Sequence, residues 1–302
     1  MNIAVKIGNA IFPNPVTVAS GTFGHAEKYY NLEEVKKLGA IVPKTVTLFA
    51  QKGNPPLRIF ETHAGMVNAI GIENPGADGF IAEKLPVFKK IGVPLIISIL
   101  GHNDEQFQML TEKFNAVDGV SALELNLSCP NLKHKVLVAQ DPQATARVVG
   151  LVKKVSKVPV IAKLSPNVTD ISEIALAAEG AGADAVSLIN TFSAMVIDTK
   201  KRRPVLGNLT GGLSGPAIRP IAVHMVYQTA RRVKVPVIAM GGITTAQDAL
   251  EFLIAGASMV AVGTANFINP RAPLDVLEGI KAYMKAHKMK DIREVTGSLK
   301  GS

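Results

Sequence analysis

Eight short β-rich runs alternate with eight longer amphipathic stretches along this chain, and that alternation limits its fold more than any other feature. The expected strands are Val16–Ala19, Ile41–Lys44, Leu95–Ile99, Ala122–Leu125, Val160–Leu164, Ala185–Ile189, Val237–Met240 and Met259–Val262. The expected helices are Leu32–Leu38, Gly79–Ile91, Asp104–Phe114, Pro142–Val155, Asp170–Gly180, Ala217–Arg232, Ala246–Ile254 and Leu274–His287. Eight successive strand–helix units favour a closed parallel barrel over an open sheet, so we predict an α/β protein with a (β/α)8 TIM barrel.

Internal repeats support this barrel. The run at 157–162 (Lys-Val-Pro-Val-Ile-Ala) recurs at 234–239, and Gly-Ala-Asp at 182–184 is matched by Gly-Ala-Ser at 256–258. Each repeat offset spans two strand–helix units, as duplicated quarter-barrels would. An N-terminal β-hairpin near Val5–Ile11 is expected to plug the bottom of the barrel, and top-face insertions are expected at roughly 45–76 and 191–216. No linker or low-complexity segment divides the chain, so we expect one domain over residues 1–302.

Composition excludes several classes of protein. Apolar residues make up 47% of the 302 residues and charged residues 19%, which allows a large core and excludes a wholly disordered chain. The single cysteine, Cys129, allows no intrachain disulfide and leaves too few thiolates for a four-cysteine zinc site or an ordinary iron–sulfur cluster. No apolar run is long enough to span a bilayer, and the amino end has no signal-type apolar region. We therefore expect a soluble, cytoplasmic protein.

The formal net charge of +9 indicates anionic ligands or partners. Nucleic acid fits this charge poorly, because the basic residues are dispersed and the chain has no tryptophan on which bases could stack. The longest basic cluster is 200–203 (Lys-Lys-Arg-Arg), which is ordinarily a solvated loop but could also belong to a docking face. We therefore expect anionic small molecules rather than nucleic acid.

Cys129 lies in the hexapeptide 126–131 (Asn-Leu-Ser-Cys-Pro-Asn), directly after the expected strand Ala122–Leu125. The thiol stands between two carboxamides, where a strand gives way to a proline-containing loop, and parallel α/β proteins carry catalytic groups at such positions. A lone cysteine can equally be a small buried apolar residue. Position alone leaves both interpretations open.

In a parallel barrel the active face lies where the strands end. The segments expected there are 20–22, 44–45, 101–102, 126–131, 163, 190–191, 241–242 and 263–264. The glycines at 241, 242 and 263 follow the last two strands, where barrels commonly bind phosphate through backbone N–H groups. Tight turns also need glycine, but two such sites on adjacent strands indicate a phosphorylated cofactor or substrate.

Two lysines and four asparagines are expected at this face. Lys44 and Lys163 each end an apolar strand, where an unpaired ammonium is costly to bury. An anionic ligand is a natural partner for them, and a structural salt bridge is the alternative. The asparagines are Asn68, Asn126, Asn131 and Asn190. Their carboxamides offer donors and acceptors without charge, which suits a ligand with alternating ring N–H and C=O groups, such as a pyrimidine.

These residues resemble the class 1 dihydroorotate dehydrogenases of pyrimidine synthesis, over about residues 3–285. The motifs that match are 43–45 (Pro-Lys-Thr), 68–76 (Asn-Ala-Ile-Gly-Ile-Glu-Asn-Pro-Gly), 126–131, 163–167 (Lys-Leu-Ser-Pro-Asn), 189–191 (Ile-Asn-Thr), 211–216 (Gly-Gly-Leu-Ser-Gly-Pro) and 262–265 (Val-Gly-Thr-Ala). Segments 74–76, 168–171 and 210–220 are most similar to the catalytic subunit of the NAD-dependent class 1B type. The fumarate-using class 1A type and the membrane-associated class 2 type, which has serine at the base position, fit less well.

The resemblance implies a barrel that binds FMN and oxidises dihydroorotate to orotate. Cys129 would take the proton from C5 while hydride leaves C6 for the flavin, and Lys163 would stabilise negative charge on the reduced ring. The residues implied to hold the substrate are Lys44, Asn68, Asn126, Asn131, Asn190 and Thr191. The residues implied to bind the flavin are Ser20, Gly21, Lys44, Thr45, Asn126, Lys163, Ile189, Gly215, Gly241, Gly242, Gly263 and Thr264.

Transfer of electrons to NAD would need a second protein. No Gly-x-Gly-x-x-Gly motif follows an expected strand, and one cysteine cannot hold an iron–sulfur cluster. In class 1B enzymes the next carrier is a subunit with FAD and a [2Fe–2S] cluster. The resemblance therefore implies a heterotetramer in which two copies of this chain form a homodimer core.

Three other functions remain as alternatives. A related flavin barrel could reduce a different pyrimidine, as dihydropyrimidine dehydrogenase does. A flavin-free barrel could use Lys163 as a Schiff-base nucleophile on a sugar phosphate, as aldolases do. A non-catalytic ligand-binding barrel would not need the thiol.

Overall fold

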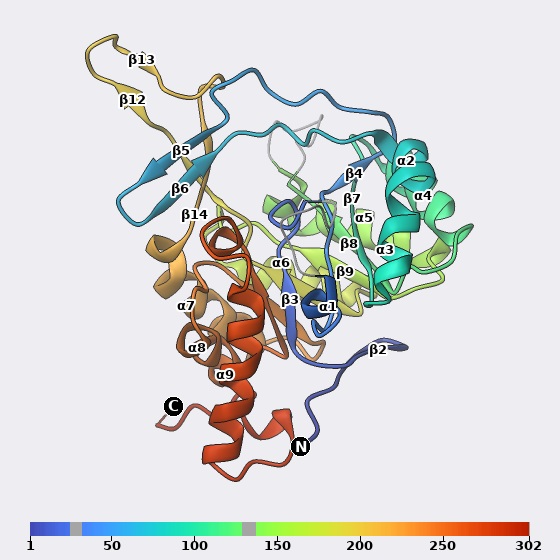
Figure 1. Ribbon diagram of the computed structural model, residues 1–302. Helices are drawn as coiled ribbons and strands as arrows, with labels where there is room; N and C mark the ends of the chain where they lie inside the picture. Colours follow the sequence, from blue (N-terminus) through green and yellow to red (C-terminus); the bar gives the residue numbers. More distant parts are fainter. Residues whose placement is uncertain (25–31, 129–136, 302) are drawn as a thin grey trace.

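Eight parallel strands form the centre of the computed structural model, which describes residues 1–24, 32–128 and 137–301. In space their order is β3-β16-β15-β10-β9-β8-β7-β4, and the helices pack around the outside of this sheet (Figure 1). The strands are β3 (Val16–Val18), β4 (Val46–Thr47), β7 (Ile96–Leu100), β8 (Ala122–Asn126), β9 (Val160–Lys163), β10 (Ala185–Leu188), β15 (Val237–Met240) and β16 (Met259–Val262).

The sheet curls until its first strand meets the segment that precedes β4. The backbone N–H of Gly39 donates to the carbonyl of Val16 over 2.8 Å. The hydroxyl of Thr17 donates to the carbonyl of Ala40, and the hydroxyl of Ser20 donates to that of Pro43. These bonds join the two edges of the sheet, so the prediction of a (β/α)8 barrel is confirmed.

The second strand differs from its expected position at Ile41–Lys44. Ile41 bridges Leu95, and regular pairing resumes only at Val46, which pairs with Ile99. Pro43 has no N–H to give to a ladder, which interrupts the strand. The chain advances five residues from Ile41 to Val46, whereas its partner advances four residues from Leu95 to Ile99. One residue is therefore extra, as in a β-bulge. Because of that extra residue, Lys44 and Thr45 both line the cavity described below.

Four of the helices begin at a residue whose side chain caps the first turn. Asn103 caps α4, Asp141 caps α5, Asp170 caps α6 and Thr245 caps α8, each accepting a hydrogen bond from a backbone N–H of the first turn. The α-helices are α1 (Leu32–Val35), α2 (Gly76–Gly79), α3 (Leu85–Ile91), α4 (Asp104–Asn115), α5 (Pro142–Val155), α6 (Ile171–Gly180), α7 (Arg219–Ala230), α8 (Ala246–Ala255) and α9 (Ala272–Ala286).

Three helix expectations are corrected in their bounds. The helix expected at Gly79–Ile91 begins at Gly76 and contains a π-turn at Phe80–Lys84 between α2 and α3. The helix expected from Ala217 starts as a 3-10 turn at Pro216–Ile218 before α7, because prolines at 216 and 220 cannot donate to a preceding turn. The first helix, α1, ends at Val35 rather than Leu38.

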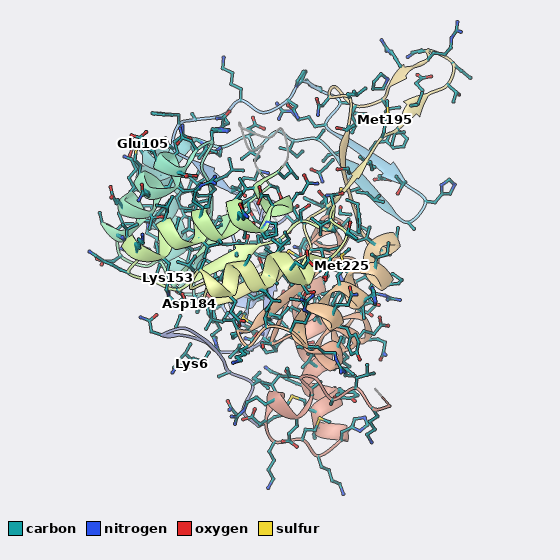
Figure 2. The ribbon with its side chains drawn as sticks, turned by 180° about the vertical axis from the view of Figure 1, so that it is seen from behind. Lys6, Glu105, Lys153, Asp184, Met195 and Met225 are labelled. Atoms are coloured by element: carbon teal, nitrogen blue, oxygen red, sulfur yellow. The ribbon has the colours of Figure 1, made fainter. Side chains whose placement is uncertain are left out.

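The N-terminal hairpin closes the bottom of the barrel, as predicted. β1 (Val5–Ile7) and β2 (Ala10–Phe12) pair antiparallel, and both Ile7 and Phe12 are fully buried. They pack against interior residues near the start of the barrel strands, including Ile96, Ala122 and Met259. The chain ends also lie at this bottom (Figure 1). From behind, Lys6 of the hairpin lies below Asp184, which forms an ion pair with Lys153 of α5 (Figure 2).

The two insertions meet above the barrel in one four-stranded sheet, a pairing that the sequence analysis did not foresee. Its order is β11-β14-β6-β5, from β5 (Ile59–Thr62), β6 (Gly65–Asn68), β11 (Phe192–Ala194) and β14 (Gly211–Ser214). The small hairpin of β12 (Ile197–Asp198) and β13 (Arg203–Pro204) projects beyond it (Figure 1). The basic cluster at 200–203 forms the exposed end of this arm, where Asp198 accepts from the N–H groups of Lys200 and Lys201.

In the described ranges, none of the helices has the length and apolar character needed to cross a membrane.

Candidate functional site

A cavity of about 440 Å³ opens at the C-terminal ends of the barrel strands, beneath the sheet formed by the insertions. All of the predicted site residues that the structure describes line it. They are Ser20, Gly21, Lys44, Thr45, Asn68, Asn126, Lys163, Ile189, Asn190, Thr191, Gly215, Gly241, Gly242, Gly263 and Thr264. Cys129 and Asn131 lie outside the described residues. The cavity therefore has the size of a small-molecule site, and the role of each residue stays a prediction.

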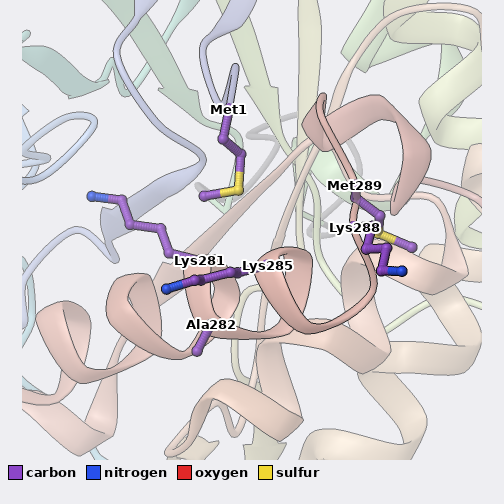
Figure 3. A pocket seen from close by; sticks show the side chains of 6 residues that line it. All are labelled: Met1, Lys281, Ala282, Lys285, Lys288 and Met289. Carbon is purple, nitrogen blue, oxygen red and sulfur yellow. The ribbon is translucent and has the colours of Figure 1, made fainter.

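A second hollow at the opposite end of the molecule is similar in volume, at about 460 Å³. It is lined by Met1, Lys281, Ala282, Lys285, Lys288 and Met289, mainly from α9 and the turn after it (Figure 3). All except Met289 are exposed, and the lysines meet no buried polar group there. The upper cavity, with its buried charges and convergent amides, is the candidate site.

The two cavity lysines differ in their surroundings. Lys163, at the end of β9, is 6% exposed and lies 3.6 Å from the Oε1 atom of Glu124, which is 3% exposed. Lys44 forms no such ion pair in the described part of the chain. Burial lowers the pKa of Lys44, as does the nearby charge of Lys163, while Glu73 acts in the opposite direction. Lys163 thus has a buried carboxylate nearby among the described residues, and Lys44 has none.

A polar layer, made of Ser98, Glu124, Lys163 and Ser187, lies at the base of the cavity, and of these four only Lys163 lines the cavity itself. Each of the four follows an apolar interior residue of the same strand by two positions. Because residues two apart on a strand point to the same face, all four side chains face the barrel interior. The hydroxyl of Ser187 donates to Oε2 of Glu124 over 3.0 Å. Ser98 shares a hydrogen bond with Thr45 over 3.0 Å, and Thr45 also contacts Ser20 over 3.1 Å.

The carboxamides are held in place by neighbouring polar groups. Asn190 donates to the hydroxyl of Ser128 over 2.7 Å, and its own oxygen accepts from the N–H of Thr191. Asn126 accepts from the N–H of Ser128 and lies 3.4 Å from the Thr45 hydroxyl. Such bonds fix the direction of each amide without using all of its donors and acceptors.

The four-stranded sheet of the insertions (β11-β14-β6-β5) packs closely against the cavity. Asn68, at the end of β6, donates to the carbonyl of Gly212 on β14, 144 residues away along the chain. A Cβ atom at position 212 would lie 2.0 Å from the hydroxyl oxygen of Thr191, so only glycine allows this approach. Asn68 and Thr191 are thereby brought into the same cavity wall.

Three glycine-bearing loops form another wall of the cavity. Gly242 has a φ of 75°, and a Cβ atom there would lie 2.7 Å from the carbonyl oxygen of Gly215. The hydroxyl of Thr264 donates to that of Ser214 over 2.9 Å, which ties the loop after β16 to the end of β14. Backbone at this wall can approach a bound group closely, in keeping with the prediction of an anion site.

Sequence reasoning missed several residues of the site. Glu124 lies within the expected strand Ala122–Leu125, and a carboxylate at an inward position of an apolar strand is the signal that could have identified it. Ser128, which fixes Asn190, was also passed over. Glu73 stands at the rim, bound to Arg58 over 2.5 Å. The apolar wall comes from Ile59, Met66, Ile70, Ile72, Ile218, Met240 and Phe267. No sequence pattern distinguishes those residues from core residues.

Within the described ranges, no group of three or more histidine, cysteine or acidic side chains is arranged to bind a metal ion.

Comparisons with known proteins agree on one family. A family model described as "Dihydroorotate dehydrogenase" matches residues 2–284. A relative in Desulforudis audaxviator is 51% identical over 98% of this chain and 96% of its own length. A second, in Alkaliphilus metalliredigens, is 50% identical over 99% of both chains, and a third, in Geotalea uraniireducens, is 48% identical over 99% and 98%. Each of the three is named "Dihydroorotate dehydrogenase B (NAD(+)), catalytic subunit".

Proposed function

Because the chain belongs to the dihydroorotate dehydrogenase family, we propose that it oxidises dihydroorotate to orotate in pyrimidine synthesis. The observation that carries this proposal is the upper cavity, which gathers two lysines, three asparagines and a glycine-rich wall from segments far apart in the sequence. A cavity with a few convergent polar groups is the usual form of an enzyme's substrate site. We also propose that residues 1–302 act as one FMN-binding domain in the cytoplasm.

The residues of the cavity fit FMN. The glycine-bearing loops at 215, 241–242 and 263–264 would hold its phosphate, and Ser20, Gly21, Thr45 and Ile189 would contact its ring system. Lys163 presents a buried ammonium to the cavity, and no hydrogen bond within the described residues uses its donors. Bound there, FMN would supply the acceptor for the hydride that leaves C6 of the substrate.

Charge and amides would position the substrate. Lys44 would bind the carboxylate of dihydroorotate, because its half-buried ammonium forms no ion pair within the described residues and therefore gains most from an anion. Asn68, Asn126, Asn131, Asn190 and Thr191 would contact the ring N–H and C=O groups. A substrate that lacks the carboxylate, such as dihydrouracil, should therefore bind much less well.

Two residues would act on the reaction itself. Cys129, which follows β8 by three residues, would remove the proton from C5 as the hydride leaves C6. Lys163 would provide positive charge where negative charge develops, which lowers the barrier without a proton transfer. The Lys163–Glu124 ion pair also argues against the aldolase alternative, because a Schiff-base nucleophile must be uncharged when it attacks.

Electrons would leave through a second protein. The relatives are named as catalytic subunits of NAD-dependent enzymes, which favours the NAD-linked type over the fumarate-using type. This chain has one cysteine, which is too few to hold an iron–sulfur cluster. We propose a partner subunit with FAD and a [2Fe–2S] cluster, bound to a homodimer of this chain in a heterotetramer.

A steady-state assay of the purified chain tests the proposal. Dihydroorotate should be oxidised with an artificial dye as acceptor, while NAD should be reduced only after the partner subunit is added. Dihydrouracil should be a poor reductant at the same concentration. The proposal fails if dihydroorotate reduces no acceptor, and its partner component fails if the chain alone reduces NAD as fast as it reduces the dye.

A further inference from the structure

Among the described residues, Glu124 is a buried charged side chain of the barrel interior to which the proposed mechanism gives no task. It lies on β8, two residues before Asn126, and β8 pairs with β9 so that Asn126 stands opposite Lys163. Ser187 of β10 stands opposite Lys163 on the other side of β9. Glu124 therefore approaches Lys163 from below, on the side away from the open cavity.

The geometry of the pair differs from that of a closed salt bridge. The Nζ atom of Lys163 and Oε1 of Glu124 are 3.6 Å apart, which is longer than the 2.7–2.9 Å typical of charge-assisted hydrogen bonds. Oε1 is buried and accepts no hydrogen bond, while Oε2 is held by Ser187 over 3.0 Å. Glu124 thus provides the charge that compensates a buried ammonium but leaves the three N–H donors of Lys163 unused by the described residues.

Lys44, the other lysine of the cavity, has no buried carboxylate beside it among the described residues. The charged groups that face the two lysines from the described elements are the lysines themselves, Glu124 below and Glu73 at the rim. The side chain of Glu73 is 56% exposed and is bound to Arg58, so water and a cation screen its charge. Of the two cavity lysines, only Lys163 has a buried carboxylate beside it among the described residues.

We propose that Glu124 is a positioning residue that keeps Lys163 charged, with its N–H donors directed into the cavity. Ser187 fixes the carboxylate for this task. The consequence of this inference, that Lys163 offers a permanent positive charge to the flavin, rests on the proposed function. Without Glu124, two ammonium groups would share one cavity floor with no buried anion between them, and Lys163 would release its proton more readily.

The test is trace acetylation of the purified holoprotein with acetic anhydride between pH 6 and pH 11, with each labelled lysine identified by mass spectrometry. The midpoint of each pH profile reports the charge state and does not depend on how easily the reagent reaches the cavity. In Glu124→Gln, we expect the Lys163 midpoint to fall by at least about one pH unit, a tenfold gain in the neutral amine at a given pH below it. Lys113 on the surface serves as the internal reference and should not shift.

Two further variants keep the test decisive. Ser187→Ala should lower the Lys163 midpoint in the same direction by a smaller amount, and it decides the question if Glu124→Gln does not fold. Thr111→Val, at a fully buried hydroxyl of α4 that is bound to Phe107, should leave the midpoint unchanged. An unchanged Lys163 midpoint in the first two variants would overturn the proposal, as would an equal shift in Thr111→Val.

A second readout connects the pair to the cofactor. The reduction potential of the bound flavin should depend more steeply on pH in Glu124→Gln than in the wild type and should meet that of Lys163→Gln at high pH. Identical profiles for wild type and Glu124→Gln would contradict the role proposed for Glu124. Failure of the proposed function would show itself differently, as protein without flavin, and the acetylation profile would still decide whether Glu124 keeps Lys163 charged.

Discussion

The lower and upper halves of the barrel interior are built from the same strands yet have opposite character. On β7, β8, β9 and β10, the lower interior residues Ile96, Ala122, Ile161 and Ala185 are apolar, and they pack on the hairpin. Two residues further on, the same strands carry Ser98, Glu124, Lys163 and Ser187. One half of the interior therefore provides stability, while the other carries buried polar groups that only a ligand site requires.

The largest effect should come from the upper half, at the proposed base. Cys129→Ser should slow dihydroorotate oxidation at neutral pH by roughly 10²–10⁴-fold, because a hydroxyl is a far weaker base than a thiolate. Flavin content and thermal stability should stay near those of the wild type. Stopped-flow reduction of the flavin measures the rate, and an unchanged rate across neutral pH would remove Cys129 from the mechanism.

A substitution in the lower half of the interior should reduce stability without affecting substrate binding. Phe12→Ala should lower the free energy of unfolding by roughly 3–5 kcal/mol, because it leaves a cavity at a fully buried aromatic position. The affinity of the folded protein for dihydroorotate should not change. Ile11→Ala, on the exposed side of the same hairpin at 68% exposure, is the matched control and should cost far less. Denaturant titration measures both, and a loss of affinity in Phe12→Ala would blur the distinction between the halves.

Removal of the Lys44 ammonium should weaken binding of the substrate. Lys44→Met should raise the KM for dihydroorotate roughly 10–100-fold, the scale expected for the loss of one hydrogen bond to a charged group. Lys113→Met, which removes a surface lysine paired with Asp78, should leave the KM unchanged. Initial-rate kinetics with a dye acceptor would decide, and equal KM values in the two variants would place the substrate carboxylate elsewhere.

The smallest effect should be on the free energy of unfolding, which the half-buried ammonium of Lys44 lowers at neutral pH. Its pKa in the folded chain lies below the ordinary value of 10.5, chiefly through burial and secondly through Lys163. At a pH between the pKa of Lys44 in the folded chain and its ordinary pKa, Lys44 binds more protons in the unfolded chain than in the folded chain. The free energy of unfolding of the wild type therefore increases as pH rises through that range. Lys44→Met should therefore be more stable than the wild type at neutral pH, with a gain that shrinks as pH approaches 10.5. A gain that grows with pH would contradict the assignment.

Local patterns predicted most of the fold and of the site. The alternation within Ile161-Ala162-Lys163 places an apolar and a charged residue on one interior face, and the ends of parallel strands converge, so Lys163, Asn126 and Asn190 could be assigned to one face. The strand expected at Ile41–Lys44 runs through Pro43 and was wrong in its bounds, because the interruption and the extra residue that turns both Lys44 and Thr45 inward depend on the register with β7.

Other features depend on contacts between distant segments. The pairing of β6 with β14 brings together residues 144 positions apart, and strands so short carry no register signal of their own. The ion pair of Glu124 with Lys163 required two adjacent strands to be aligned before it could be seen. The apolar side chains of the cavity wall match core residues in type, so only the three-dimensional arrangement separates the two sets.

Anaerobic mixing of the freshly purified chain with dihydroorotate, followed by absorbance, tests directly whether the chain is a flavin-dependent dihydroorotate dehydrogenase. We expect a yellow protein with tightly bound FMN whose colour bleaches within a single turnover, with one orotate formed per flavin and no partner subunit present. A colourless protein, or a yellow one that dihydroorotate does not bleach, would contradict it.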